Sequence, residues 1–181
     1  MDNLLQKATR LIEEKGWHGF ELGQLIDEEN PAHVVYERFT CRMDVLTAMG
    51  RYFDQQLLKN MDIFDEDESK KDRLFSLMMT RMDVLAPHKA VIAVLWRDLW
   101  KDPLSMALSL PLGLKSMTWI LQSAGVETQS WLGVVRLKAF AVCYLSVIAA
   151  WLEDHDPDMD VTMKVLDSNL DRLSMIPRFY E

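Results

Sequence analysis

The residues that could catalyse a reaction or hold a metal are scattered along the chain rather than grouped. The four histidines, His18, His33, His88 and His155, lie far apart and form no HxxxH pair. A zinc site needs several His or Cys ligands at short, defined spacing, so the sequence predicts none. Gly-rich phosphate loops and GxSxG nucleophile motifs are also absent from it. We therefore expect no enzymatic activity, no metal and no cofactor.

Alternating acids over residues 154–160, DHDPDMD, are the one segment with a calcium-like pattern. An EF-hand loop beginning there would need glycine at position 159 and glutamate at position 165. The chain has Met159 and Val165 at those positions. The better interpretation is a loop between two helices, with Asp160 as the cap of the second.

Large aromatic and flexible side chains crowd the two helices predicted near residues 87–101 and 103–123. The chain holds twelve methionines and six tryptophans. Such side chains fill irregular cores, and they also line adaptable apolar pockets. Both interpretations stay open, a plain core or a site for a small apolar, lipid-like or aromatic ligand. The candidate ligand-binding residues are Trp96, Trp100, Met106, Leu110, Met117, Trp119, Phe140 and Tyr144.

The elements that position these residues are predicted to be helices. Glycine and proline are scarce, at seven and six residues, and no segment alternates like a strand. Apolar residues recur at helical spacing, and caps or breakers such as Asp2, Gly16, Thr40 and Gly125 set the helix ends. Asn30-Pro31 and Asp102-Pro103 are typical helix starts, and Pro111 with Gly113 should kink or split the helix that contains them. We expect an all-α protein of about nine helices, near residues 2–16, 21–26, 31–39, 42–61, 71–85, 87–101, 103–123, 130–153 and 160–175.

The segment 130–153 is the most apolar of these helices. Its uncharged part, residues 139–152, is shorter than the ~20 apolar residues of a membrane span, so we predict a buried core helix and no transmembrane segment. Small residues follow one stripe of the helix, where another helix could approach closely. We expect the partner to be a second subunit. The predicted dimer-interface residues are Ala139, Cys143, Ser146 and Ala150.

The charge and the cysteine content indicate which cellular compartment and which binding partners to expect for this protein. The net charge of −8 opposes indiscriminate binding to nucleic acid or anionic membranes. Cys41 and Cys143 form no CxxC pair and suit a reducing compartment. No signal-peptide pattern opens the chain, so we expect a cytoplasmic protein. The acidic run at residues 62–69 is predicted to be a solvated loop.

Residues in the first quarter of the chain resemble the N-terminal head of TetR-family regulators. Tyr36, Phe39, Arg42, Val45 and Leu46 match the family's spacing of a tyrosine, a phenylalanine, a basic residue and two apolar residues. The resemblance implies a helix-turn-helix head at 1–46 and a helical ligand-binding and dimerisation body at 47–181. It also implies a homodimer formed by the last two helices and a recognition helix at 31–36 that binds operator DNA. The implied DNA-binding residues are Pro31, Ala32, His33, Tyr36 and Arg42.

The body carries a second resemblance, to the TetR-like accessory proteins of ubiquinone biosynthesis. Asp72-Arg73-Leu74, Trp119, Trp151 and the segment 154–170 carry this similarity. It implies an isoprenoid or other lipid ligand in the body and a head that does not depend on DNA. The head itself is acidic, since residues 1–50 hold five Lys or Arg against nine Asp or Glu. A ligand-responsive regulator and a lipid-binding accessory protein of quinone biosynthesis therefore both remain hypotheses.

Overall fold

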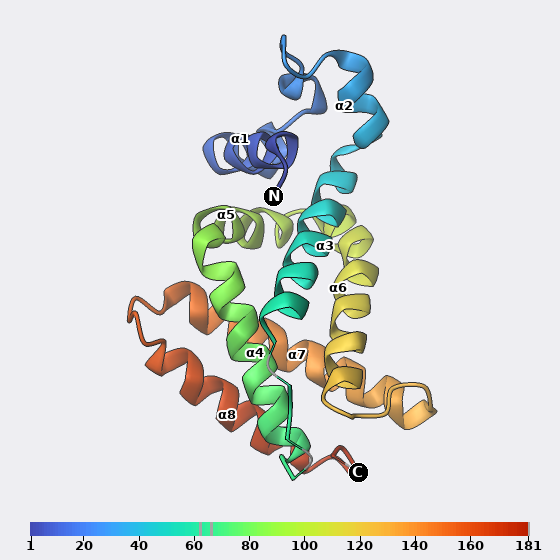
Figure 1. Ribbon diagram of the computed structural model, residues 1–181, viewed down its shortest axis with the longest axis vertical. Helices are drawn as coiled ribbons and strands as arrows, with labels where there is room; N and C mark the ends of the chain where they lie inside the picture. Colours follow the sequence, from blue (N-terminus) through green and yellow to red (C-terminus); the bar gives the residue numbers. More distant parts are fainter. Residues whose placement is uncertain (62, 66, 181) are drawn as a thin grey trace. The chain divides into compact units, whose positions relative to one another are not determined.

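The computed structural model describes residues 1–61, 63–65 and 67–180, and all its regular elements in this part are helical. This confirms the all-α prediction. Two short 3-10 helices, η1 (Leu22–Leu25) and η2 (Ala86–His88), join longer helices. The α-helices, shown in Figure 1, are α1 (Asn3–Gly19), α2 (Ala32–Arg38), α3 (Arg42–Asn60), α4 (Lys70–Leu85), α5 (Lys89–Leu99), α6 (Pro103–Ser123), α7 (Trp131–Glu153) and α8 (Asp160–Ser174).

The predicted count of about nine helices is wrong, because the described residues contain eight α-helices. The difference lies at residues 21–26, where η1 replaces the expected second helix. The N–H of Ile26 bonds to the carbonyl of Gly23 at 3.3 Å, which closes a 3-10 turn. Glycine at the centre of so short a segment disfavours the costly nucleation of an α-helix.

The chain divides into two compact units that do not follow its order. Unit 1 contains residues 1–55 and 85–113, and unit 2 contains residues 56–84 and 114–181. The residues from 85 to 113 therefore belong with the helix-turn-helix head, which the sequence placed at 1–46. Within α6, the first half belongs to unit 1 and the second half to unit 2.

The core of unit 1 forms where α1 packs against α5. Asp2 caps α1 as predicted, since its Oδ1 accepts the N–H of Leu5 at 2.8 Å. Apolar residues of α1 at i, i+3 and i+4 spacing point inward, and the head helices add their own buried residues. The fully or nearly fully buried side chains include Leu5, Ala8, Ile12, Trp17, Phe20, Leu25, Val35, Phe39, Val45, Met49 and Val91.

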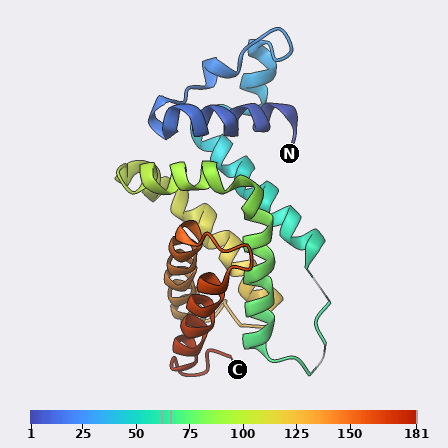
Figure 2. The same cartoon turned by 90° about the vertical axis from the view of Figure 1, so that its left-hand side faces the viewer.

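The core of unit 2 is organised around the predicted apolar helix, which forms as α7 and packs against α8. Figures 1 and 2 show these two helices side by side. Ser130 caps α7, because its Oγ accepts the N–H of Gly133 at 3.1 Å. The side chains buried here include Leu74, Leu77, Met78, Ile120, Leu121, Phe140, Val147, Trp151, Leu166 and Leu170.

Two predictions of helix caps are corrected. Asn30 does not cap α2, because Pro31 occupies the cap position and Asn30 bonds to Asp27 instead. Asp160 does not cap α8; Asp154 binds both the N–H and the hydroxyl of Thr162, each at 2.8 Å. A side chain six residues before the helix thus takes the place of the expected cap.

The helix expected to split at Pro111 and Gly113 continues unbroken as α6. Gly125 ends the turn after it with φ +83°, a conformation that favours glycine. By length and composition alone, α6 and α7 are both apolar enough to cross a bilayer. Both also contribute side chains to the buried core. Of the acidic run predicted as a loop, residues 62 and 66 lie outside the described residues, and 63–65 form no helix.

Candidate nucleic-acid interface

The helix α2, predicted to read DNA bases, is short and is held by two buried anchors. Val35 and Phe39 are almost completely buried, so the helix is fixed from its inner side. The turn before it is closed by Asp27, whose carboxylate accepts the N–H of Asn30 at 2.7 Å. Lys7 of α1 pairs with Asp27 and donates to the carbonyl of Leu25 at 2.9 Å. The hydrogen bond from Lys7, followed by that from the Asn30 backbone, lowers the pKa of Asp27.

The outer side of α2 is open to solvent. Ala32 and His33, predicted to face base edges, are exposed, and Tyr36 is half exposed at 51%. Pro31 fixes the start of the helix with φ −65°. The structure thus brings four of the five predicted DNA-binding residues onto one short helical segment. A rigidly anchored helix with a bare outer face has the geometry that a major groove accepts.

The fifth predicted residue, Arg42, lies against Trp17 and Asp102 of unit 1, with its side chain 39% exposed. Its guanidinium carbon lies 5.0 Å from the centroid of the Trp17 ring, and its Nη2 lies 3.6 Å from Asp102 Oδ2. Asp102 also caps α6 by accepting the N–H of Ser105 at 3.1 Å. The hydrogen bonds of Ser105, more than the charge of Arg42, lower the pKa of Asp102. In this arrangement Arg42 stabilises the packing of α3 on Trp17.

Two further cations of the head are paired with acids. Arg38, at the end of α2, lies 2.9 Å from Asp2, and Lys7 pairs with Asp27 as above. Three of the five cations in residues 1–50 therefore have acidic partners inside the subunit. Glu37 adds an exposed carboxylate to α2 itself. The face offers shape and base-reading groups, but few cations for phosphates.

The predicted ligand-binding residues fall into both compact units. In unit 1, Trp96 and Trp100 touch edge to face with centroids 5.5 Å apart, and Trp100 and Leu110 are exposed. Met106 is half buried. In unit 2, Met117 and Phe140 are buried, whereas Trp119 and Tyr144 are half buried.

One polar residue near this set was missed from sequence. Arg81 of α4 is only 6% exposed, and its Nε donates to the hydroxyl of Tyr144 at 3.4 Å. Helical periodicity gave a partial signal that Arg81 is buried. It lies three residues after the buried Met78 and four residues before the buried Leu85, on the same side of the helix. A buried guanidinium beside a tyrosine hydroxyl can orient an oxygen-bearing ligand in an otherwise apolar body.

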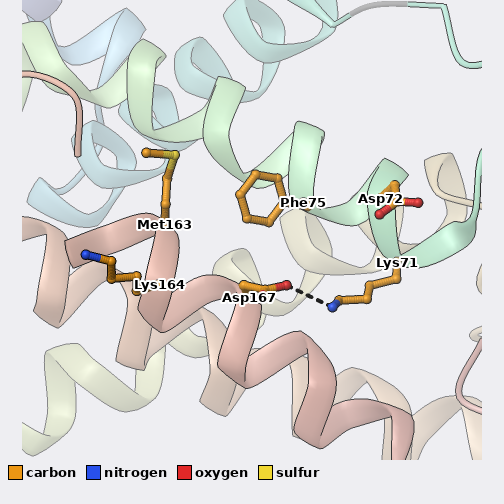
Figure 3. Close-up of a pocket in the computed structure, with 6 residues that line it drawn as sticks. All are labelled: Lys71, Asp72, Phe75, Met163, Lys164 and Asp167. Atoms are coloured by element: carbon orange, nitrogen blue, oxygen red, sulfur yellow. Dashed lines mark ion pairs between the residues drawn. The ribbon is translucent and has the colours of Figure 1, made fainter. Parts of the chain in front are cut away.

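A groove on the surface of unit 2 lies between α4 and α8 (Figure 3). Its volume is about 400 Å³, and Phe75 and Met163 supply its apolar side chains. Lys71 bridges the two helices, 2.8 Å from Asp167 and 2.6 Å from Asp171. These carboxylates raise the pKa of Lys71, Asp167 first. Asp72 and Lys164 complete the lining, and none of the predicted ligand residues contributes to it.

The predicted dimer-interface residues are engaged to different degrees within the single subunit. Cys143 is buried, and burial raises the pKa of its thiol to about 12. Ser146 accepts a hydrogen bond from Asn169 of α8 at 3.2 Å. Ala139 and Ala150 remain half exposed. Their role in a dimer stays a prediction, although the Ser146 contact shows that part of the stripe meets α8 of the same chain.

Comparisons with known structures identify the fold. A TetR transcriptional regulator from Nitrosomonas europaea ATCC 19718 superposes with a TM-score of 0.73 at 15% identity, over 95% of this chain and 96% of that one. A TetR transcriptional regulator from Rhodococcus sp. RHA1 gives a TM-score of 0.66 at 16% identity, over 93% and 92%. The chain has the TetR fold.

The similarity to TetR regulators is structural, since no protein-family model and no curated protein sequence matches the chain. It spans nearly the whole chain, so the TetR fold covers the head and the body alike. Neither neighbour bears on the resemblance to accessory proteins of ubiquinone biosynthesis, which stays a prediction.

Proposed function

We propose that this chain is a TetR-type transcriptional regulator that binds operator DNA through α2. The observation that carries the proposal is the anchored helix with an open outer face, on a chain with the TetR fold throughout. Ala32 and His33 would contact base edges, while Tyr36 would donate to a phosphate. We assign no catalytic role to the protein and place it in the cytoplasm, where its operator would be.

The regulator would act as a homodimer assembled through α7 and α8. Both helices leave apolar side chains exposed in the single subunit, among them Trp131 and Val142 on α7 and Val161 on α8. Burying such side chains between two subunits would stabilise the assembly. Two heads related by a twofold axis would then read the two halves of a palindromic site.

A small apolar ligand held in the body would regulate DNA binding. Arg81 and Tyr144, which hydrogen-bond to each other, would supply polar groups for the head of such a ligand, and the buried Phe140 and Met117 would supply apolar surface. A ligand that binds one spacing of the two heads better than another changes operator affinity by that difference.

The pairing of the head's cations sets the expected strength of DNA binding. The slope of log K against log salt is about −0.9 for each phosphate that a protein neutralises. With Lys7, Arg38 and Arg42 already paired to acids, we expect a slope of only about −2 to −3 for each head. Discrimination should therefore depend more on base contacts than on general attraction to the backbone.

Selection from randomised DNA, followed by fluorescence anisotropy on the enriched sequence, tests the proposal. His33→Ala should cost roughly 1–3 kcal/mol of discrimination at one base position. Tyr36→Phe should weaken binding evenly across sequences, because a phosphate contact carries no sequence information. His155→Ala, an exposed histidine outside the head, is the matched control and should bind normally. If no sequence is enriched even at low salt, α2 does not read DNA and the proposal fails.

The second candidate function is an isoprenoid-binding accessory role in quinone biosynthesis. The observation that favours it is the pairing of Arg38 with Asp2 and of Arg42 with Asp102, acids of the same chain that compete with DNA phosphates for these cations. Lipid extracted from gently purified protein and identified by mass spectrometry tests this role. A polyisoprenoid in the extract, together with no DNA enrichment, would select it over the regulator. An empty protein that takes up no added polyisoprenoid would exclude it.

A further inference from the structure

The first half of α6 has its polar and apolar sides reversed. Ser105 is buried at 4% exposure, where its Oγ accepts the indole N–H of Trp17 at 3.3 Å. Ser109 is half buried and donates to the carbonyl of Met106. The leucines, by contrast, point outward, with Leu104 exposed by 69%. We call the exposed side formed by Leu104, Leu108 and Leu112, which follow one another at i, i+4 spacing, the α6 leucine face. Leu110 is also exposed, on another side of the helix, and Trp100 lies before α6 at the end of α5.

The leucine face offers a partner no hydrogen-bonding side chain. Residues 103–114 carry no charge, and the side chains exposed among them are all those of leucine, alanine or proline. Protein–protein interfaces carry about one hydrogen bond for every 100–200 Å². The three leucines expose apolar area on the order of 300 Å², well below the ~800 Å² that each partner contributes to a stable protein interface. The lack of hydrogen-bonding side chains and the small apolar area both fit a face that contacts lipid acyl chains better than one that contacts another protein.

The ends of the leucine face carry the groups that headgroups attract. Trp100 and the exposed Lys101 lie at its start, and Lys115 follows the uncharged stretch. Asp102, the acid nearest in sequence, is half buried and engaged with Ser105 and Arg42. A tryptophan and leucines flanked by lysines form the usual pattern of a helix that lies in a membrane interface.

We propose that the α6 leucine face docks this protein on the surface of a phospholipid bilayer that contains anionic lipid. The side chains of Leu104 and Leu108 enter the acyl boundary, while Lys101 contacts lipid phosphates. The helix lies on the membrane and does not cross it. Its uncharged part spans twelve residues, short of the ~20 needed, and Ile120 and Leu121 in its second half are buried in the core of unit 2. This docking goes beyond operator binding and does not depend on it.

Co-sedimentation of the full chain with vesicles tests the proposal. The vesicles are phosphatidylcholine alone, or phosphatidylcholine and phosphatidylglycerol in equal parts. The wild type should sediment with the mixed vesicles and less with the neutral ones. Leu104→Ser combined with Leu108→Ser should lower the partition coefficient about tenfold or more, because each leucine loses its transfer into the acyl region. Met175→Ser, which removes a side chain that is 80% exposed at the end of α8, is the matched control and should sediment like the wild type.

A fluorescent probe reports where the membrane touches the protein. In a Cys41→Ser background, Leu108→Cys labelled with an environment-sensitive dye should shift to the blue when mixed vesicles are added. The same dye on Ser168→Cys, an exposed position of α8, should not shift. Circular dichroism checks that each variant is folded, and release by alkaline carbonate separates docking from insertion across the bilayer.

Three outcomes would overturn the proposal. The wild type fails to sediment with either vesicle, or the double leucine variant and Met175→Ser sediment equally. The third contradicting outcome is that the double leucine variant changes the oligomeric state, measured by light scattering, without changing sedimentation with vesicles. The leucine face would then pack against a second copy of the chain.

Discussion

The main-chain N–H of Trp17 donates to the carboxylate of Asp98 over 2.9 Å, joining residues 81 positions apart. The contact depends on Gly16, which breaks α1 with φ +78° and ψ 166°. A Cβ at position 16 would lie 2.9 Å from the same Asp98 oxygen. The indole of Trp17 bonds to Ser105, and Arg42 stacks on its ring. The end of α1 is thus an anchoring point for α3, α5 and α6.

Replacing Gly16 should therefore be costly. Gly16→Ala forces a left-handed conformation on alanine and pushes its methyl group against Asp98, so we expect a loss of roughly 1–3 kcal/mol in the free energy of unfolding. Gly50→Ala in α3 is the control, because nothing lies within 4 Å of the position its methyl group would take, and alanine favours helix. Urea denaturation measures both. Equal effects would show that the break in α1 carries no strain.

The Asp98 carboxylate should make stability depend on pH. Arg97 first, and then the N–H of Trp17, lowers the pKa of Asp98. A lowered pKa means that the folded state binds fewer protons, so this stabilisation is complete above the unfolded value of about 4 and is lost as the pH falls below it. Asp98→Asn should therefore destabilise the protein at neutral pH, and the difference should shrink in acid. Asp83→Asn, at an exposed position of α4, is the control. If the difference in unfolding free energy between the wild type and Asp98→Asn stays constant down to about pH 3, the prediction is wrong.

The two cysteines should differ strongly in reactivity. Burial raises the pKa of Cys143 to about 12, whereas Cys41 is exposed. Only thiolates react with Ellman's reagent, so at about pH 8 the native protein should release one equivalent quickly and a second only after unfolding. Cys41→Ser should remove the fast phase. Two fast equivalents in the native protein would mean that the face of α7 near Cys143 opens readily.

The loop before α8 should owe its stability to Asp154. Thr162→Val removes the hydroxyl that donates to the buried Asp154 carboxylate and should cost about 1–3 kcal/mol. Asp158→Ala in the same loop should stay within about 0.5 kcal/mol, because Asp158 is exposed. Thermal unfolding compares the pair. A smaller loss for Thr162→Val than for Asp158→Ala would show that the loop is held by another contact.

Much of the fold follows from signals that act over a few residues. The caps at Asp2 and Asp102 and the stop at Gly125 lie where the sequence places them, since each involves neighbours within five positions. The apolar run that forms α7 is equally local. The α-helix predicted at residues 21–26 was wrong for an equally local reason. The four residues around Gly23 can close a 3-10 turn but are too few for a stable α-helix.

The candidate site was less predictable because it depends on contacts between distant residues. The exposure of Ala32, His33 and Tyr36 follows from the periodicity that buries Val35. The position of Arg42 does not, since Trp17 and Asp102 meet it from 25 and 60 residues away in the chain. The buried Arg81 and the outward leucines of α6 likewise depend on which side of each helix its neighbours cover.

The break at Gly16 also decides whether the head can be treated as a transferable module. A fragment ending at residue 46 would keep Trp17 and Arg42 but leave behind their partners Asp98 in α5, Asp102 in the turn that follows it, and Ser105 in α6. Its largest buried aromatic side chain would then face water, with an unpaired backbone N–H beside it. Chimaeras that exchange operator specificity must therefore carry residues 85–113 along with the head.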